Sequence, residues 1–167
     1  MNFFKLFTVF FLAVTINSCS VYNFTGTGKI DAKTFQVNYF QNTAELIEPG
    51  IDVTFTRNLQ NLIQNQTNLD LTNANGDLLY EGEIVEYRIA PMTATADQGA
   101  SQSRLTITVM VRFSNKNKEA DNFEKRFSFF DDFPSDTQMA AAQLTKSLDI
   151  IFERITQDIF NDSLAKW

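Results

Sequence analysis

The sequence contains no histidine and a single cysteine, Cys19. The absence of histidine removes the commonest general base and the commonest metal ligand of proteins. It also excludes the Ser–His–Asp and Cys–His arrangements of nucleophilic catalysis. One cysteine can form neither an internal disulfide nor a thiolate cage for zinc. The sequence therefore predicts no metal, no cofactor and no catalytic residue, and any enzyme hypothesis would have to use carboxylates.

The first residues have the layout of a secretory signal. One positive charge, Lys5, precedes the apolar run Leu6–Ile16, and small residues lead from there to Cys19. A membrane-spanning helix needs roughly 20 apolar residues, so this run is too short to be one. We therefore expect residues 1–18 to be a signal peptide that is removed from the mature protein.

The segment Ile16-Asn17-Ser18-Cys19 resembles the cleavage box of bacterial lipoproteins, and Asn17 is its one departure from the usual pattern. The resemblance implies that the chain is cut before Cys19, that the cysteine sulfur receives a diacylglycerol, and that the new amino terminus is acylated, with palmitate as an expected fatty acid. Acyl chains contribute about 0.8 kcal/mol per buried CH₂, and more than one chain makes anchoring stable. No acidic residue follows Cys19 directly, which implies the periplasmic face of the outer membrane. The alternative is an ordinary signal peptide with a chance cysteine.

The mature chain is long enough for one domain with a real core. Residues 19–28, which include Gly26 and Gly28, are expected to form a lipidated tether, and residues 29–167 a single domain. The full chain has 14 basic and 20 acidic side chains, a net charge of −6, and the loss of Lys5 with the signal makes the mature charge −7. This acidic excess argues against nucleic acid as a partner.

Alternation of apolar and polar residues predicts the strands. They cover residues 34–40, 78–90, 104–114 and 122–130, with a short edge strand at 69–71. Residues 41–50 and 93–103 are expected to be loops. Pro91 is expected to end its strand, Gly82 to mark a bulge or a close backbone contact, and Lys125 to lie near a sheet edge.

The helical period predicts two helices, one over residues 51–66 and one that begins at Pro134 and runs through Phe160. Ser135 and Gln138 fit a capping box for the second. Both helices and the best strands have one apolar face, so burying these faces together predicts an α+β fold. We expect a two-layer sandwich, with a mixed or antiparallel sheet of about four strands and two helices packed on one face. The uncharged amide face of the first helix fits either docking against protein or simple composition bias.

Several stretches resemble LptE-like lipopolysaccharide-assembly lipoproteins. They are residues 19–26, Gln36–Asn42, Tyr80–Ile84, Arg104–Val109 and Asp158–Asn161. The resemblance covers essentially the whole mature chain. It implies a lipid-anchored subunit on the periplasmic face of the outer membrane, which plugs the large β-barrel that inserts lipopolysaccharide, assists its assembly and touches the glycolipid in transit. It implies no catalysis.

Contact with a phosphorylated glycolipid would need Arg or Lys side chains. The candidates are Arg88, Arg104, Arg112, Lys116 and Lys118. The resemblance assigns none of them as binding residues, and the other interpretation is that they are solvated charges that protect strand edges. The negative net charge also argues against strong binding of an anionic ligand.

Two other functions stay open from the sequence. One is a stand-alone periplasmic lipoprotein that binds a lipid or another ligand in a pocket between sheet and helices. The other is an enzyme that uses paired carboxylates, either Asp131 and Asp132 or Glu81 and Glu83. Charged pairs of this kind on strands are usually only solvated, so we do not expect catalysis.

Overall fold

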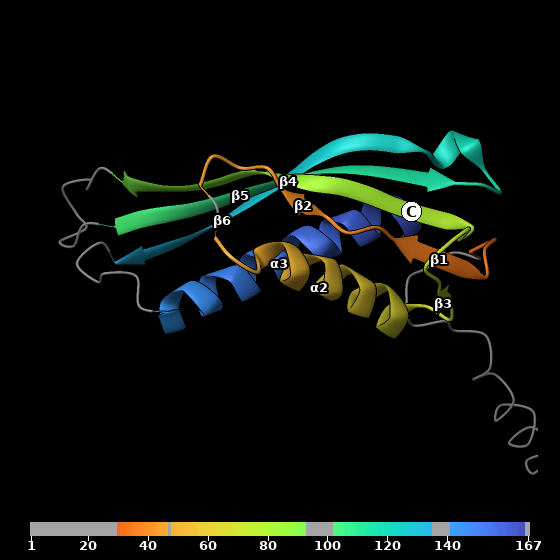
Figure 1. Ribbon diagram of the computed structural model, residues 1–167, viewed down its shortest axis with the longest axis horizontal. Coiled ribbons are helices and arrows are strands. Elements are labelled where there is room, and N and C mark those ends of the chain that lie inside the picture. Colours follow the sequence, from red (N-terminus) through yellow and green to blue (C-terminus); the bar gives the residue numbers. More distant parts are fainter. Residues whose placement is uncertain (1–29, 47, 93–101, 135–140, 166–167) are drawn as a thin grey trace, which may run out of the picture.

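The computed structural model describes residues 30–46, 48–92, 102–134 and 141–165. The signal peptide, Cys19 and the tether lie outside these residues, as do Ser135 and Gln138 of the expected capping box. In the described chain, two helices cover one face of a six-stranded sheet (Figure 1). The expected α+β arrangement with both helices on one face is therefore confirmed.

The sheet is mixed, as expected, but it has more strands than expected. The elements in chain order are β1 (Thr34–Val37), β2 (Gln41–Asn42), α2 (Ile51–Gln66), β3 (Asp70–Leu71), β4 (Leu78–Met92), β5 (Gln102–Asn115), the 3₁₀ turn η2 (Glu119–Asp121), β6 (Phe123–Pro134) and α3 (Ala141–Leu164). The strand order is β3-β1-β4-β5-β6, and β2 also pairs with β4. β4, β5 and β6 are antiparallel neighbours, whereas β1 is parallel to β3 and β4, and β2 is parallel to β4.

The two helices bury the apolar stripes that the sequence shows. α2 has the predicted bounds and buries four large apolar side chains, Ile51, Phe55, Leu59 and Ile63. α3 buries Ile151, Phe152, Ile155, Ile159 and Phe160. Facing them, β5 buries the predicted set Leu105, Ile107, Val109, Val111 and Phe113. Edge-to-face ring pairs link these elements: Phe55 of α2 contacts Phe40, between β1 and β2, at 5.2 Å and Phe152 of α3 at 5.3 Å between ring centroids.

Both prolines that were expected to mark boundaries lie within strands. Pro91 is paired with Ser103, in the part of β4 that has a partner only on its β5 side among the described strands. A residue without an N–H is tolerated at such a sheet edge, so β4 continues to Met92. Pro134 does not open a helix but ends β6, because the strand alternation continues through Phe133, which is buried.

The expected hairpin is formed by β5 and β6, and β6 is the last strand of the sheet. Lys125 therefore lies on an edge strand, as predicted. Its position on the helix-facing side would bury a charge, but its ammonium reaches outward to an ion pair with Asp162 of α3. The long Lys side chain allows the aliphatic part to lie on apolar surface while the charge stays exposed.

The strand predicted over residues 34–40 is interrupted. β1 ends at Val37, and the N–H of Asn38 donates to the carbonyl of Tyr80. The alternation then breaks, because the Tyr39 side chain is 51% exposed and the adjacent Phe40 is fully buried. The chain resumes pairing as β2, so Gln41 and Asn42, expected to start a loop, belong to the sheet.

Gly82 explains why Phe40 can turn inward at this point. A Cβ atom added to Gly82 would lie 2.0 Å from the Met110 carbonyl oxygen and 2.6 Å from Cε1 of the Phe40 ring. Only a residue without a side chain leaves room for both neighbours. The predicted close contact at Gly82 is confirmed, whereas the register shift of β4 lies further along, between Ile84 and Glu86.

Replacement of the fully buried ring of Phe152 tests whether α3 is docked as described. We expect Phe152→Ala to lower the free energy of unfolding by about 3–5 kcal/mol through the cavity it leaves, as measured by denaturant melts. Glu153→Ala, at the adjacent exposed position, should change it by no more than about 0.5 kcal/mol. A loss below about 1 kcal/mol for the Phe152 variant would contradict the packing.

Gly82→Ala tests the close contact. Overpacking costs about 1–3 kcal/mol and sometimes more, and we expect the upper end because one neighbour is a backbone carbonyl that cannot rotate away. Gly50→Ala is the comparison: a Cβ there meets open space, so only its left-handed φ is strained, by about 1–2 kcal/mol. Equal melting of the Gly82 variant and the wild type would show that the strands are not packed this closely.

Candidate functional site on the open face of the sheet

The face of the sheet opposite the helices has no covering layer among the described elements (Figure 1). Alternate residues of β4, β5 and β6 point to this open face and meet in cross-strand rows. The register places Glu81, Arg112 and Glu124 in one row, and Ala90, Arg104 and Asp132 in another. The charged members of the face are the acids Glu81, Glu83, Glu86, Glu124 and Asp132 and the bases Arg88, Arg104, Arg112 and Arg126. Their numbers nearly balance, so the face is polar with little net charge.

Most of these charges are paired within the face. Arg112 lies 3.7 Å from Glu81 and 3.5 Å from Glu124, and Arg88 lies 3.0 Å from Glu86. Arg104 binds both carboxylate oxygens of Asp132, at 2.7 and 2.8 Å, and its guanidinium lies 3.6 Å from the centre of the Phe130 ring. Exposed pairs of this kind contribute roughly 0–1 kcal/mol each. Their main effect is that the open face offers few unpaired charges.

Two carboxylates on the face are held in their charged form. Glu86 accepts a hydrogen bond from Thr108 at 2.7 Å, and this bond, together with Arg88, holds its pKa below the usual value. The hydrogen bond from Arg104 does the same for the pKa of Asp132. Both acids therefore stay ionised at neutral pH and keep their basic partners engaged.

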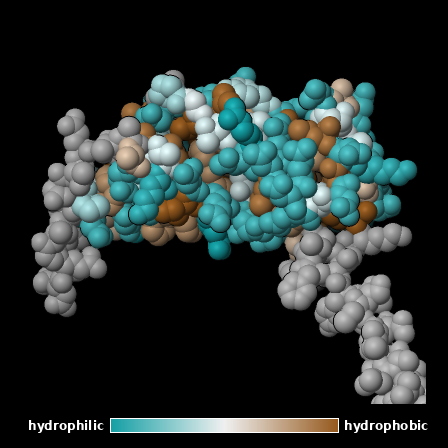
Figure 2. All heavy atoms as spheres, turned by 90° about the horizontal axis from the view of Figure 1, so that it is seen from below, coloured by the Kyte–Doolittle hydropathy of each residue, from teal (hydrophilic) through white to brown (hydrophobic). Residues whose placement is uncertain are grey.

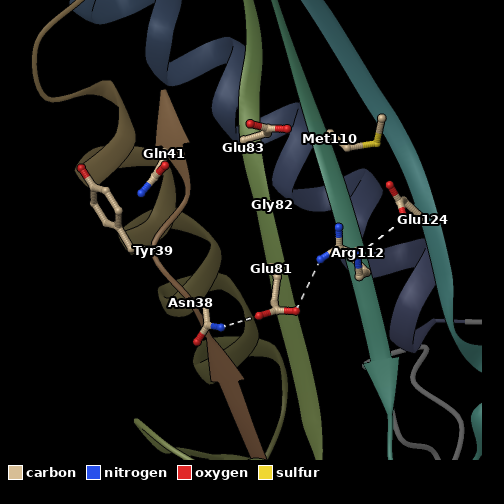
Figure 3. Close-up of a pocket in the computed structure, with 9 residues that line it drawn as sticks. All are labelled: Asn38, Tyr39, Gln41, Glu81, Gly82, Glu83, Met110, Arg112 and Glu124. Carbon is tan, nitrogen blue, oxygen red and sulfur yellow. Dashed lines mark hydrogen bonds and ion pairs between the residues drawn. The ribbon is translucent and has the colours of Figure 1, made fainter. Parts of the chain in front are cut away.

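A groove of about 410 Å³ opens on this face beside Gly82 (Figure 3). It is lined by Asn38, Tyr39, Gln41, Glu81, Gly82, Glu83, Met110, Arg112 and Glu124. Asn38 donates to Glu81 at 2.6 Å, and the Tyr39 hydroxyl donates to Asp52 at the start of α2. Of the nine, only Glu81, Glu83 and Arg112 were expected as candidate site residues; Gly82, Met110 and Glu124 were not, and neither were Asn38, Tyr39 and Gln41 at the break between β1 and β2. The signal that could have found them is the pair of adjacent aromatic residues at positions 39 and 40, which cannot both lie on one face of a strand.

The structure does not bring the five basic candidates together. Arg88, Arg104 and Arg112 lie in separate rows of the open face, whereas Lys116 and Lys118 lie in the β5–β6 turn. Lys118 pairs with Asp121 at 3.1 Å. Each candidate arginine already has an acidic partner, so the five do not form one preformed phosphate site.

The carboxylate pairs do not form a catalytic site either. Asp131 and Asp132 point to opposite faces of β6, because Asp131 accepts from Ser147 of α3 while Asp132 binds Arg104 on the open face. Glu81 and Glu83 share a face, but Glu81 is engaged by Asn38 and Arg112. Within the described residues, no group of three or more His, Cys, Asp or Glu could hold a metal ion.

The seam between sheet and helices is filled by side chains that are fully buried, including Phe35, Phe40, Phe113 and Phe160. The hollows at Gly82 and at Ile30 both lie outside this seam.

The described helices include none that is long and apolar enough to cross a membrane. Cys19, the predicted lipidation site, lies outside the described residues.

Comparison with known proteins adds solved structures of lipoproteins. A minor lipoprotein from Acinetobacter baumannii shares 13% identity and a TM-score of 0.48, with 76% of this chain and 92% of that one covered. The rare lipoprotein B from Shewanella oneidensis shares 14% identity and a TM-score of 0.41, with 76% and 89% covered. Lipoprotein B from Nitrosomonas europaea shares 12% identity and a TM-score of 0.41, with 83% and 88% covered. No curated protein matches the sequence.

The family comparison covers nearly all of the described chain. The model of the LptE family, described as lipopolysaccharide-assembly, matches residues 32–163. This range runs from the segment before β1 to the last turn of α3 and includes every described strand, α2 and all but the last residue of α3. The protein therefore belongs to the LptE family of lipopolysaccharide-assembly proteins.

Proposed function

We propose that this protein is a lipoprotein of the outer membrane, anchored through Cys19 on the periplasmic side, and that it serves as plug and assembly partner of the large β-barrel that inserts lipopolysaccharide. The observation that carries the proposal is the LptE family match over residues 32–163. The lipoprotein-like segment that ends at Cys19 supports the anchor. The protein acts by binding and has no catalytic role.

The open face of the sheet suits the wet lumen of a barrel. A plug that carries unpaired charges loses their hydration when it enters a narrow space, which is costly. Here Arg88, Arg104 and Arg112 are each already paired with an acidic side chain of the same face. A face of matched charges and hydroxyls can therefore lie against a polar wall with little loss.

The helix side is also polar. Figure 2 shows this side covered mostly by hydrophilic residues, with smaller apolar areas between them. The exposed residues of α2 include the uncharged Thr54, Asn61, Gln64 and Asn65 and a single basic one, Arg57. Amides can donate and accept hydrogen bonds without the desolvation cost of a full charge. Both outer surfaces thus suit contact with a polar protein wall.

Lipopolysaccharide itself is a further proposed contact. Of the three candidate arginines, Arg88 is the best placed to reach a phosphate, because its side chain is 63% exposed, more than those of Arg104 and Arg112. Its partner Glu86 also accepts from Thr108, so Glu86 keeps a hydrogen bond if Arg88 turns away. The alternative function, a stand-alone lipoprotein with an internal ligand pocket, has less support because the described seam is filled with side chains.

Cys19→Ser tests the anchor. We expect the variant to lose metabolic labelling by an alkyne analogue of palmitate and to leave the outer-membrane fraction, because serine cannot form the thioether to diacylglycerol. Ser20→Ala, which keeps the cysteine, should retain both label and location. Label that persists on the serine variant would overturn the lipid anchor at this position.

Purification of the tagged, full-length protein in mild detergent tests the partnership. We expect a large β-barrel protein to be recovered with it, because a plug stays bound inside its barrel. Depletion of the protein from cells should also lower the amount of lipopolysaccharide at the cell surface. Normal surface lipopolysaccharide after depletion would contradict the proposed function.

A further inference from the structure

Glu83 is the carboxylate of the groove that has no partner among the described residues. Glu81 and Glu124 both face Arg112, and Glu81 also accepts from Asn38 (Figure 3). Glu83 lies on the same face of β4 and is only partly exposed, but no hydrogen bond or ion pair joins its carboxylate to a described residue. Arg126 lies in the same cross-strand row, beyond Met110, and helps to hold the pKa of Glu86 below its usual value.

Tyr39 forms the opposite wall of the groove. In Figure 3 its ring lies on the other side of β2 and Gln41 from Glu83, and Tyr39 is half exposed. The hydroxyl is fixed by its hydrogen bond to Asp52 of α2, which keeps the ring at the rim. The face of such a ring attracts a guanidinium or ammonium group, and Asp52 adds a negative charge nearby.

The lining as a whole also favours a cation. It contains three carboxylates, Glu81, Glu83 and Glu124, and one guanidinium, that of Arg112. Its other polar groups include the side-chain amides of Asn38 and Gln41, whose oxygens can accept hydrogen bonds. An anionic group would meet an excess of negative charge here, whereas a single positive side chain would complete the pairing of the row.

We propose that this groove receives an arginine or lysine side chain of the partner protein, at the Glu83 carboxylate and beside Gln41, with the Tyr39 ring at the rim. The inference rests on the proposed function, because the partner meant is the β-barrel protein. The planar guanidinium of arginine can bind a carboxylate through two hydrogen bonds while it stacks on an aromatic ring. The groove would thus fix how the plug is oriented against the barrel wall.

A metal ion fits the groove less well than a basic side chain. The described residues contain no group of three or more His, Cys, Asp or Glu that could bind one. The guanidinium of Arg112 lies between Glu81 and Glu124, so it would repel a divalent cation placed there. A singly charged side chain that enters beside Glu83 avoids this repulsion because it lies on the Tyr39 side.

Removal and reversal of the charge at Glu83 test the proposal on the full-length, membrane-anchored protein. We expect Glu83→Gln to reduce the recovered barrel about tenfold, because a charge-assisted contact is lost, and Glu83→Lys to reduce it further. Glu119→Lys in η2 is the matched control, because Glu119 is exposed and lies in the turn between β5 and β6; it should leave recovery unchanged. Thermal melts of each variant would show that the fold is kept.

The outcomes separate the two proposals. If the wild type recovers the barrel and the Glu83 variants do so equally well, the groove proposal is wrong and the proposed function stands. If the wild type itself recovers no barrel, both proposals are wrong.

A photocrosslinker in place of Gln41 gives a direct readout in cells. We expect a crosslinked barrel peptide that contains arginine or lysine, and a crosslink to a peptide without either, to a second copy of this chain or to lipopolysaccharide would overturn the inference.

Discussion

The close approach of β4, the β5 backbone and the Phe40 ring at Gly82 shapes the part of the molecule that we connect with function. β4 passes so near to β5 and to the Phe40 ring that no side chain fits at this position. The ring can therefore fill the core against Phe55 while the chain around it turns away from regular pairing. That turn divides the strand expected over residues 34–40 into β1 and β2, and it leaves Tyr39 at the rim of the groove. Gly82 therefore affects both the packing of Phe40 in the core and the position of Tyr39 at the groove.

The open face illustrates a second constraint. A sheet with one face uncovered must satisfy that face without a core, and this sheet does so with cross-strand pairs. Such pairs add little stability individually, but they give the face matched charges, and the guanidinium of Arg104 lies over the partly exposed Phe130 ring. The stability of the fold comes from the other face, where aromatic and aliphatic side chains are removed from water. Stability and recognition are therefore separated between the two sides of one sheet.

Sequence periodicity was sufficient for the elements that have one buried and one exposed face. The bounds of α2 and the inward set of β5 follow directly from it. It was not sufficient at the edges of the sheet. Pro91 fits because no described strand pairs with β4 there on its other side, and Pro134 fits because it is the last residue of β6. β2 could not be predicted because a two-residue pairing has no period. The groove was missed for a related reason, since its walls come from β1–β2, β4, β5 and β6, and only the tertiary register brings them together.

The proposed lipid anchor and the groove would contribute to binding in different ways. An anchor at Cys19 would confine the protein to one membrane surface, and a partner in the same membrane is then met at a high effective concentration. Under that condition the groove does not need to supply high affinity. A single salt bridge that is modest in water is enough to select one orientation among many, because electrostatic complementarity contributes to specificity more than to raw affinity. This division also fits the negative charge of the chain. A strongly acidic body gains no general attraction to an anionic glycolipid, so its selectivity must come from particular side chains at particular positions, and Glu83 is the one that the fold leaves unpaired in the groove.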